Sequence, residues 1–252
     1  MAYYKIADFI IEINTSEELY IKDRFTLAPP PLWNLLPDIS VDVTADDTKV
    51  FSSSTRELCS QEYLERMAAC NRVALELPKH GAVLLHGSAV YTGGRAIVFI
   101  ADSGVGKTTH TSLWQQYLGD RMIIINGDKP IVRMRDGKPI IYSSPWTGKE
   151  GDESDTVARL TDICVLTRSE NNYTTQIEPA ECIDEFLRQL LHPTDPIAAL
   201  AMLDTADKIL SSVNCWRIGC NISPEAAETA YNAIFSVPAP DTAAGIRAAD
   251  DK

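Results

Sequence analysis

The sequence predicts an α/β fold built on a mixed β-sheet, and three observations carry that prediction. An apolar run at residues 96–100 leads into a glycine-bearing turn and then a helical pattern at 109–118, which is typical of a buried strand followed by a helix packed on its sheet. Turn residues at 92–94 and the pair Asp136-Gly137 each separate two apolar runs and predict antiparallel hairpins. Helical patterns elsewhere supply the flanking helices.

The first 58 residues are predicted to form a small β-rich segment, either within the same domain or folded beside it. Residues 3–14 have the composition of a strand, and the weaker runs 39–43 and 49–51 could pair with it. A helix is then predicted over 60–77, with Ser60 as its cap and Pro78 as its stop.

Residues 59–236 are predicted to form the core, and residues 237–252, rich in Ala, Asp and Pro, a disordered tail. Core strands are expected at 82–90, 96–100, 122–126, 131–134, 139–142, 159–168 and 215–219. Core helices are expected at 109–118, 180–191, 194–213 and 223–235. The polar stretch 143–155 is predicted to be a mobile loop near the functional site.

Composition narrows the classes of partner. The chain has 35 acidic and 23 basic residues, a net charge of −12, which argues against nucleic acid and against an anionic membrane surface. The sequence shows no leader pattern and no apolar stretch approaching the roughly 20 residues of a membrane span, so we expect a cytoplasmic protein. Six scattered cysteines without a C-x-x-C pair predict buried thiols rather than a zinc site.

The stretch A-D-S-G-V-G-K-T at residues 101–108 approximates the phosphate-binding pattern G-x-x-x-x-G-K-[ST], with Ala101 in place of the first glycine. In that pattern the backbone N–H groups surround a phosphate at a helix N-terminus, the lysine reaches the β- and γ-phosphates, and the hydroxyl holds Mg²⁺. A chance glycine turn before a helix is the alternative. The predicted nucleotide-binding residues are Ser103, Gly104, Val105, Gly106, Lys107, Thr108 and Thr109.

Asp128, Lys107 and His86 are the predicted catalytic residues. Asp128 follows an apolar run, where a strand-end carboxylate could accept a proton from an attacking hydroxyl or hold Mg²⁺ together with Thr108; it could also be a simple turn residue. His86 lies in an apolar strand, where a structural hydrogen bond is equally compatible with the pattern.

For several further residues, the sequence is compatible with a role in the site and also with a structural role. Arg133 could bind an anionic group or form a structural ion pair, and Lys149 with Glu150 could contact phosphate and metal or be a solvated pair. Trp114 is predicted to be core, whereas His110 is expected either near the nucleotide or on the surface.

The chain resembles the HPr kinase/phosphorylase and phosphoenolpyruvate carboxykinase group of P-loop proteins, and more closely the single-domain proteins related to HPr kinase. The resemblance covers about two thirds of the chain and rests on LLHGSAV (84–90), ADSGVGKTTHTSLW (101–114), INGDKPIVR (125–133), SPWTGKE (144–150) and CNISPEAAETAYNAI (220–234). It implies a mixed-sheet P-loop core with His86 and Asp128 at the site. The chain departs from the family pattern at Ala101 and at Gly127-Asp128, where the family carries paired aspartates.

These observations predict a kinase that uses ATP and Mg²⁺ to phosphorylate a hydroxyl of a peptide, a small protein or a small molecule, with Asp128 as base. A nucleotide-binding module without catalysis is one alternative, and a kinase with ADP or pyrophosphate as donor is another. The resemblance also implies that the protein could form a homo-oligomer.

Overall fold

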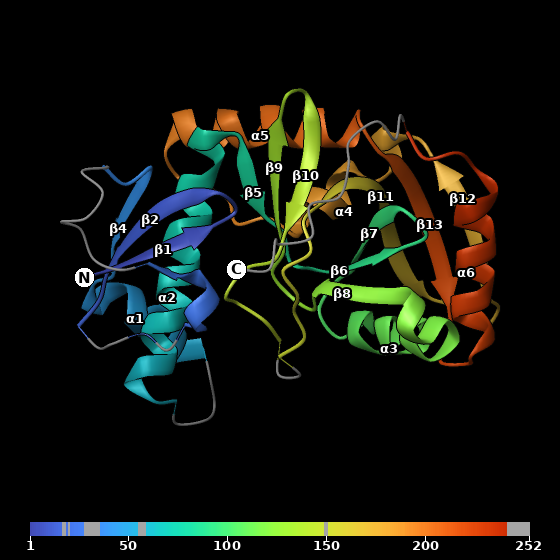
Figure 1. Cartoon of the computed structure of the whole chain (residues 1–252), viewed down its shortest axis with the longest axis horizontal. Helices are drawn as coiled ribbons and strands as arrows, with labels where there is room; N and C mark the ends of the chain where they lie inside the picture. The colour runs from blue at the N-terminus through green and yellow to red at the C-terminus, as the bar shows by residue number, and fades with distance from the viewer. Residues whose placement is uncertain (17–18, 20, 28–35, 55–58, 149–150, 241–252) are drawn as a thin grey trace.

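The computed structural model of the chain describes residues 1–16, 19, 21–27, 36–54, 59–148 and 151–240. It has the α/β architecture with a mixed sheet that the sequence predicts. Figure 1 shows a small N-terminal sheet with two helices at one end of the molecule and a larger sheet with its covering helices at the other.

The N-terminal sheet has four strands in the order β3-β1-β2-β4. Their bounds are β1 Ala2–Ile6, β2 Phe9–Asn14, β3 Thr26–Leu27 and β4 Ile39–Asp42. The prediction of one strand over 3–14 is wrong, because Ala7 and Asp8 adopt φ of 52° and 59° and turn the chain into a hairpin. The predicted pairing of the run at 39–43 is confirmed, since β4 lies parallel to β2.

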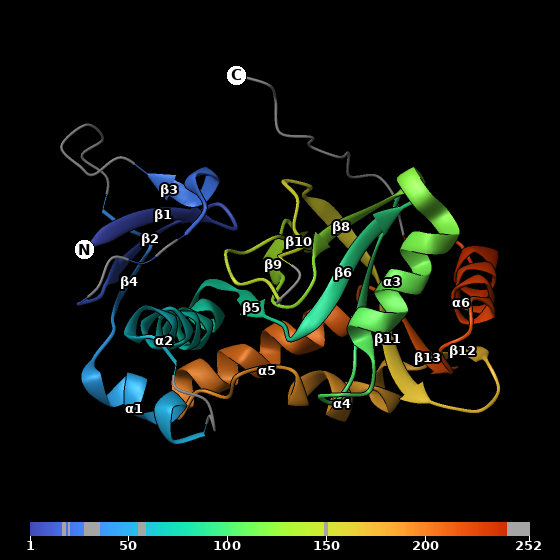
Figure 2. The ribbon, with the colours of Figure 1, turned by 90° about the horizontal axis from the view of Figure 1, so that it is seen from below.

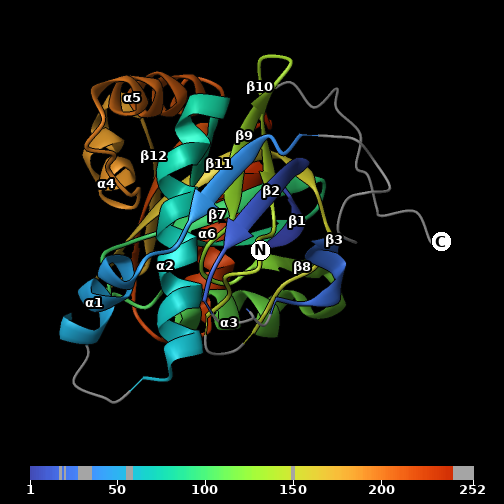
Figure 3. The same ribbon diagram turned by 90° about the vertical axis from the view of Figure 1, so that its left-hand side faces the viewer.

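Helix α1 (Ala45–Ser54) contains residues 49–51, so the strand predicted there is wrong. Its start is marked by Thr44, whose N–H donates to the carboxylate of Asp47 at 2.8 Å, and this local cap outweighs a two-residue apolar run. Helix α2 (Gln61–Glu76) begins as predicted at Ser60, whose Oγ accepts from the N–H of Tyr63 at 3.2 Å. Figure 3 shows α2 running alongside the N-terminal strands.

The large sheet contains nine strands, ordered β5-β9-β10-β11-β7-β6-β8, with β13 beside β11 and β12 at its outer edge. Strand β11 is parallel to β7 and β13, and the other pairs are antiparallel. The strands are β5 Ala82–Leu84, β6 Gly87–Thr92, β7 Arg95–Ile100, β8 Met122–Asn126, β9 Ile131–Arg135, β10 Lys138–Tyr142, β11 Ala158–Arg168, β12 Tyr173–Ile177 and β13 Asn214–Cys220.

Both predicted hairpins of this sheet are confirmed, β6 with β7 and β9 with β10. The single strand predicted over 82–90 is divided instead into β5 and β6. The cause is at Leu85 and His86, whose N–H groups donate to the carbonyls of Pro130 and Gln189 rather than to a continuous ladder. This break frees the His86 side chain from the sheet and places it at the strand end.

Helices cover both faces of the sheet (Figure 2). On one face lie α3 (Lys107–Leu118) and α6 (Glu225–Ser236), and on the other α4 (Ile183–Arg188) and α5 (Pro196–Leu210). Strand β7 is buried along its whole length, with Val98 and Ile100 facing α4 and α5 while Ile97 and Phe99 face α3 and α6. The helix predicted over 180–191 is shorter, because a 3-10 turn at Pro179–Glu181 precedes α4.

The stretch 143–155 is only partly the polar loop that its composition predicts. Ser144 and Trp146 are buried, and the Trp146 indole donates to the carbonyl of Arg66 at 3.2 Å, so the start of the stretch belongs to the core. Of the tail predicted over 237–252, the carbonyls of Val237 and Pro238 accept hydrogen bonds from Arg95 and Asn214, and residues 241–252 lie outside the described residues. Among the helices that the structure describes, none has the length and apolarity to span a bilayer.

Candidate functional site

A glycine loop, residues 101–108, connects β7 to α3 at the end of the sheet. Gly104 and Gly106 have φ of 79° and 123°, conformations that residues with a side chain rarely adopt. Gly106 is the N-cap of α3 and supplies no side-chain cap, so the first N–H groups of the helix face outward without a side-chain acceptor. Such an N-terminus is suited to binding an anion.

Lys107 lies on the first turn of α3 and its side chain folds back across the loop. Its Nζ donates to the carbonyl of Ala101 at 3.0 Å. Burial lowers the pKa of Lys107, while the negative charge of Asp128 acts in the opposite direction. The ammonium group is therefore partly desolvated and already lies where a phosphate on the helix N-terminus would meet it.

Asp128 and His86 are brought together at the neighbouring strand ends. The His86 Nε2 lies 3.3 Å from one Asp128 oxygen, and the Lys129 Nζ lies 2.9 Å from the other. Burial alone would raise the pKa of Asp128, but the hydrogen bond from His86 and the charge of Lys129 lower it to about 2. The carboxylate is thus fully ionised at neutral pH.

The turn that carries Asp128 is shaped by Asn126, the fully buried last residue of β8. Its Oδ1 accepts from the N–H groups of Asp128 at 2.9 Å and Lys129 at 2.7 Å, while its Nδ2 donates to the carbonyl of Ser144 at 3.1 Å. The Gly87 N–H donates to the Asp128 carbonyl at 2.9 Å. These bonds fix the backbone that presents the carboxylate.

The sheet topology brings this turn to the same edge as the glycine loop. Strand β8 is antiparallel to β6, and β6 is antiparallel to β7, so β7 and β8 run in the same direction. Both strands therefore end at one edge, where their following loops meet.

Asp152 is a site residue that the sequence pattern did not single out. A cavity of about 20 Å³ is lined by Thr108, Ser112, Gly127 and Asp152, together with Ser88, Thr111, Ile124 and Gly148. The Gly127 N–H donates to the Asp152 carbonyl at 3.0 Å, and an antiparallel bridge joins Asn126 to Glu153. Only this pairing brings Asp152 beside Thr108, and no spacing in the sequence signals it.

One carboxylate and several hydroxyls line this small cavity, and the described residues contain no group of three or more His, Cys, Asp or Glu side chains that could hold a metal ion without further ligands. Within the described part of the chain, the Asp152 carboxylate forms no hydrogen bond or ion pair, and Thr108 adds a hydroxyl. A space of about 20 Å³ accommodates a single water-sized species. Mg²⁺ prefers such oxygen ligands, with substrate phosphate and water completing its shell.

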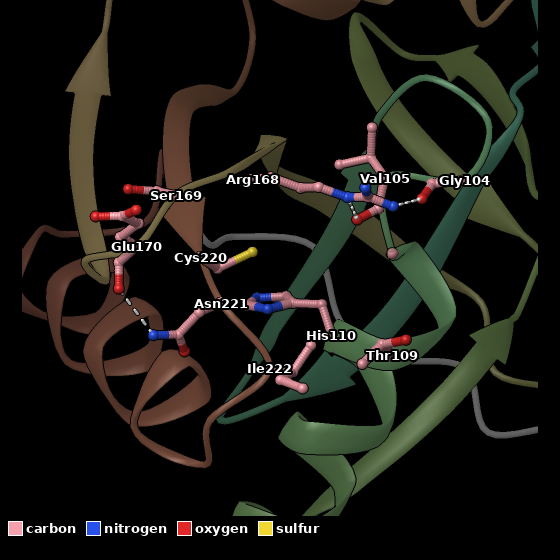
Figure 4. A pocket seen from close by; sticks show the side chains of 11 residues that line it. Gly104, Val105, Thr109, His110, Arg168, Ser169, Glu170, Cys220, Asn221 and Ile222 are labelled. Atoms are coloured by element: carbon pink, nitrogen blue, oxygen red, sulfur yellow. Dashed lines mark hydrogen bonds between the residues drawn. The ribbon is translucent and has the colours of Figure 1, made fainter.

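Two larger cavities flank the glycine loop. One of about 600 Å³ is bounded by residues 104–106, 109–110, 168–170 and 220–222 (Figure 4). The other, of about 410 Å³, lies between residues 101–105 and 165–168 and is closed by Glu185, Arg188 and Gln189. Arg168 separates them and donates to the loop carbonyls of Gly104 and Val105.

Arg133 is a predicted site residue that the structure places away from this edge of the sheet. Arg133 donates to the Ala7 carbonyl at 2.9 Å and its guanidinium lies 3.7 Å from the centre of the Phe9 ring, so it contacts the N-terminal sheet and not the glycine loop. Lys149 and Glu150 lie outside the described residues. Trp114 is fully buried as predicted, and His110 is buried as well, which excludes the surface position for it.

Comparison with known proteins gives a distant structural likeness and no match in sequence. No protein-family model matches the chain, and no curated protein matches it in sequence. Among solved structures, the chain is similar to the Hpr(Ser) kinase/phosphatase from Coxiella burnetii, with 8% identity and a TM-score of 0.35, over 61% of this chain and 97% of that one. The case for a function therefore lies in the geometry of the site itself.

Proposed function

We propose that the chain is an ATP- and Mg²⁺-dependent phosphotransferase with a hydroxyl group as acceptor. The observation that carries this proposal is the common sheet edge that holds the glycine loop with Lys107 and, after β8, the ionised Asp128. An anion-binding helix N-terminus beside a fixed carboxylate is what transfer from a nucleotide to a hydroxyl requires.

The glycine loop and Lys107 would bind the triphosphate. The N–H groups at the start of α3 would donate to phosphate oxygens, and Lys107 would exchange its bond to the Ala101 carbonyl for one to the transferred group. The positive charge of Lys107 then offsets the negative charge that develops there in the transition state. Residues 103–109 make up this binding surface.

Thr108 and Asp152 would hold Mg²⁺, which supplies charge neutralisation on the phosphates when bound. Asp128, the carboxylate assigned to the metal from sequence, is already held on both oxygens by His86 and Lys129. Asp152 is therefore the better candidate for direct coordination.

Asp128 would orient the acceptor hydroxyl. A carboxylate with a pKa of about 2 accepts a hydrogen bond readily but takes up a proton only late in the reaction, when the hydroxyl has become acidic through bond formation to phosphorus. His86 would act on Asp128 by holding its position and charge. The proposed chemistry requires a hydroxyl group on the acceptor. That hydroxyl can belong to a peptide, a protein or a small alcohol.

The test is phosphoryl transfer from ATP to a panel of serine peptides and small alcohols with wild type and Asp128→Asn. We expect transfer to fall at least about 100-fold in the variant, since a positioned acid–base group contributes roughly that much or more, while ADP binding stays within a few-fold. Asp204→Asn, an exposed change on α5, is the matched control and should behave as wild type. Nucleotide binding without Asp128-dependent transfer to any acceptor would contradict the proposal.

One observation favours a second candidate, a nucleotide-binding module without catalysis. Both Asp128 oxygens already have partners, so the carboxylate could serve only to fix the turn. This candidate predicts ADP binding with no turnover from ATP, ADP or pyrophosphate. A donor screen with those three compounds also distinguishes a kinase that uses ATP from one that uses ADP or pyrophosphate.

A further inference from the structure

The cavity of about 600 Å³ beside the glycine loop is large enough for more than a phosphate group. It begins at Gly104–Gly106 and extends across the first turn of α3 to the loops after β11 and β13. A nucleoside attached to a phosphate on the glycine loop would need a space of this kind next to it.

His110 lies in the wall of this cavity and carries an unpaired polar atom. The residue is 2% exposed, and its Nδ1 has no hydrogen-bond partner among the described residues. Figure 4 shows the ring extending from α3 toward Cys220 and Asn221. Buried polar atoms are nearly always paired, so an unpaired one in a cavity wall indicates a missing partner.

Trp114 determines which ring nitrogen of His110 carries the proton. The Trp114 Nε1–H donates to His110 Nε2 at 3.0 Å, so Nε2 is the acceptor and the proton of the neutral ring lies on Nδ1. Burial lowers the pKa of His110 to about 4, which keeps the ring neutral at pH 7. The unpaired atom is therefore a hydrogen-bond donor.

The surrounding side chains offer flat and apolar contacts. Arg168 is anchored by its bonds to the Gly104 and Val105 carbonyls, which hold its planar guanidinium at one side of the cavity. Ile222 is 83% exposed and lies on the opposite side in Figure 4. Asn221 is already engaged, since its Nδ2 donates to the Glu170 carbonyl at 3.0 Å.

We infer that this cavity binds the base of the nucleotide, with His110 Nδ1–H donating to a ring nitrogen or carbonyl oxygen of the base. The inference rests on the proposed function, because it places the base next to phosphates held by the glycine loop. Nδ1 is shielded from bulk water, so the inference requires side chains of the cavity wall to move aside when the base binds.

Two substitutions of His110 separate its two nitrogens. In His110→Asn the amide occupies the place of Nδ1 and can keep the donor, whereas in His110→Gln it occupies the place of Nε2 and keeps only the acceptor for Trp114. We expect His110→Gln to weaken ADP binding about three- to tenfold, as loss of one hydrogen bond predicts, and to leave pyrophosphate binding unchanged. His110→Asn keeps the donor, so its affinity for ADP should stay within about twofold of that of wild type. Its thermal stability should fall, because the Trp114 indole loses its acceptor.

Calorimetric titration with ADP and with pyrophosphate, both with Mg²⁺, measures these affinities, and thermal unfolding reports whether each variant is folded. Equal weakening of both ligands in His110→Gln, or stronger weakening of ADP in His110→Asn, would overturn the inference. Lys107→Ala tests the proposed function separately, because it should abolish binding of both ligands. If wild type binds neither ligand, the proposed function and the inference fall together; if Lys107-dependent binding is found and the His110 variants are alike, only the inference falls.

Discussion

Ala101 occupies the first position of the glycine loop, where the phosphate-binding pattern has glycine. Its φ is negative, so its side chain causes no backbone strain, and it is 3% exposed in the apolar cluster beneath α3 with Phe99 and Trp114. Its carbonyl meanwhile accepts the Lys107 ammonium. The alanine therefore anchors the base of the loop, and the left-handed conformations are needed only at Gly104 and Gly106.

The proposed role of Asp152 in the metal site can be tested by removing its charge. Asp152→Asn should raise the Mg²⁺ concentration needed for half-maximal ADP binding about tenfold or more, because loss of even an outer partner of a metal site lowers metal affinity roughly 10–100-fold. ADP titrations at a series of Mg²⁺ concentrations, and Mn²⁺ binding followed by electron paramagnetic resonance, measure the effect. Asp204→Asn should leave the Mg²⁺ dependence unchanged, and an unchanged dependence in Asp152→Asn would remove Asp152 from the metal site.

At the scale of elements, the last helix is fastened to the central sheet by one buried cation. Arg95, at the start of β7, donates through its Nε to Asp162 on β11 at 2.8 Å, and through one terminal nitrogen to the carbonyls of Ile234 and Val237, each at 2.8 Å. Ile234 is among the last four residues of α6, whose carbonyls lack a partner within the helical ladder, so Arg95 gives one of these carbonyls a charged donor. The indole of Trp216 donates to the same carboxylate at 2.8 Å.

Arg95→Met should lower the free energy of unfolding by about 3–5 kcal/mol, because it leaves the Asp162 carboxylate buried without a counter-charge. The double variant Arg95→Met/Asp162→Asn should lose less, since no charge is left buried and the amide oxygen introduced at position 162 can still accept from Trp216. Urea unfolding of both proteins gives the comparison. A double variant less stable than Arg95→Met would show that the charge is not the cause.

Local signals predicted most of the elements, whereas tertiary pairing decided the rest. The Ser60 cap and the Asp136-Gly137 turn act over a few residues, and the helix and hairpin that they predict are confirmed. The break at Leu85 depends on acceptors at Pro130 and Gln189, far along the chain, and Asp152 joins the site only by pairing beside β8. Such long-range contacts leave no periodic pattern for sequence analysis to detect.

At the scale of the whole molecule, the N-terminal sheet is connected to the candidate site through the stretch 151–155. Arg24 forms an ion pair with Glu153 at 2.6 Å and another with Asp155, and Lys22 also reaches Glu153 at 2.7 Å. The backbone of Glu153 also forms an antiparallel β-bridge with Asn126, which precedes the turn that carries Asp128. Residues before the first helix therefore help to position Asp152.

Arg24→Ala should loosen this connection. We expect faster amide hydrogen exchange in residues 151–155 and a few-fold higher Mg²⁺ requirement for ADP binding, smaller than in Asp152→Asn. The change removes the ion pairs of Arg24 with Glu153 and Asp155, and loss of such partly exposed pairs costs on the order of 1 kcal/mol. Arg72→Ala is the matched control, since Arg72 on α2 forms its ion pair with Asp47 on α1. Exchange that rises equally in both variants would mean that Arg24 has no special role in the loop.

The apolar cluster beneath the N-terminal sheet has a consequence for how the protein can be divided. Ile6, Phe9 and Ile11 of that sheet share the cluster with Trp146 and with Ile131 of β9 in the large sheet. A fragment beginning near residue 59 would expose Ile131 and Trp146 to water, and we expect it to aggregate. We therefore expect the two sheets to unfold as one cooperative unit, and an exchanged N-terminal part would need a matching apolar surface on the large sheet.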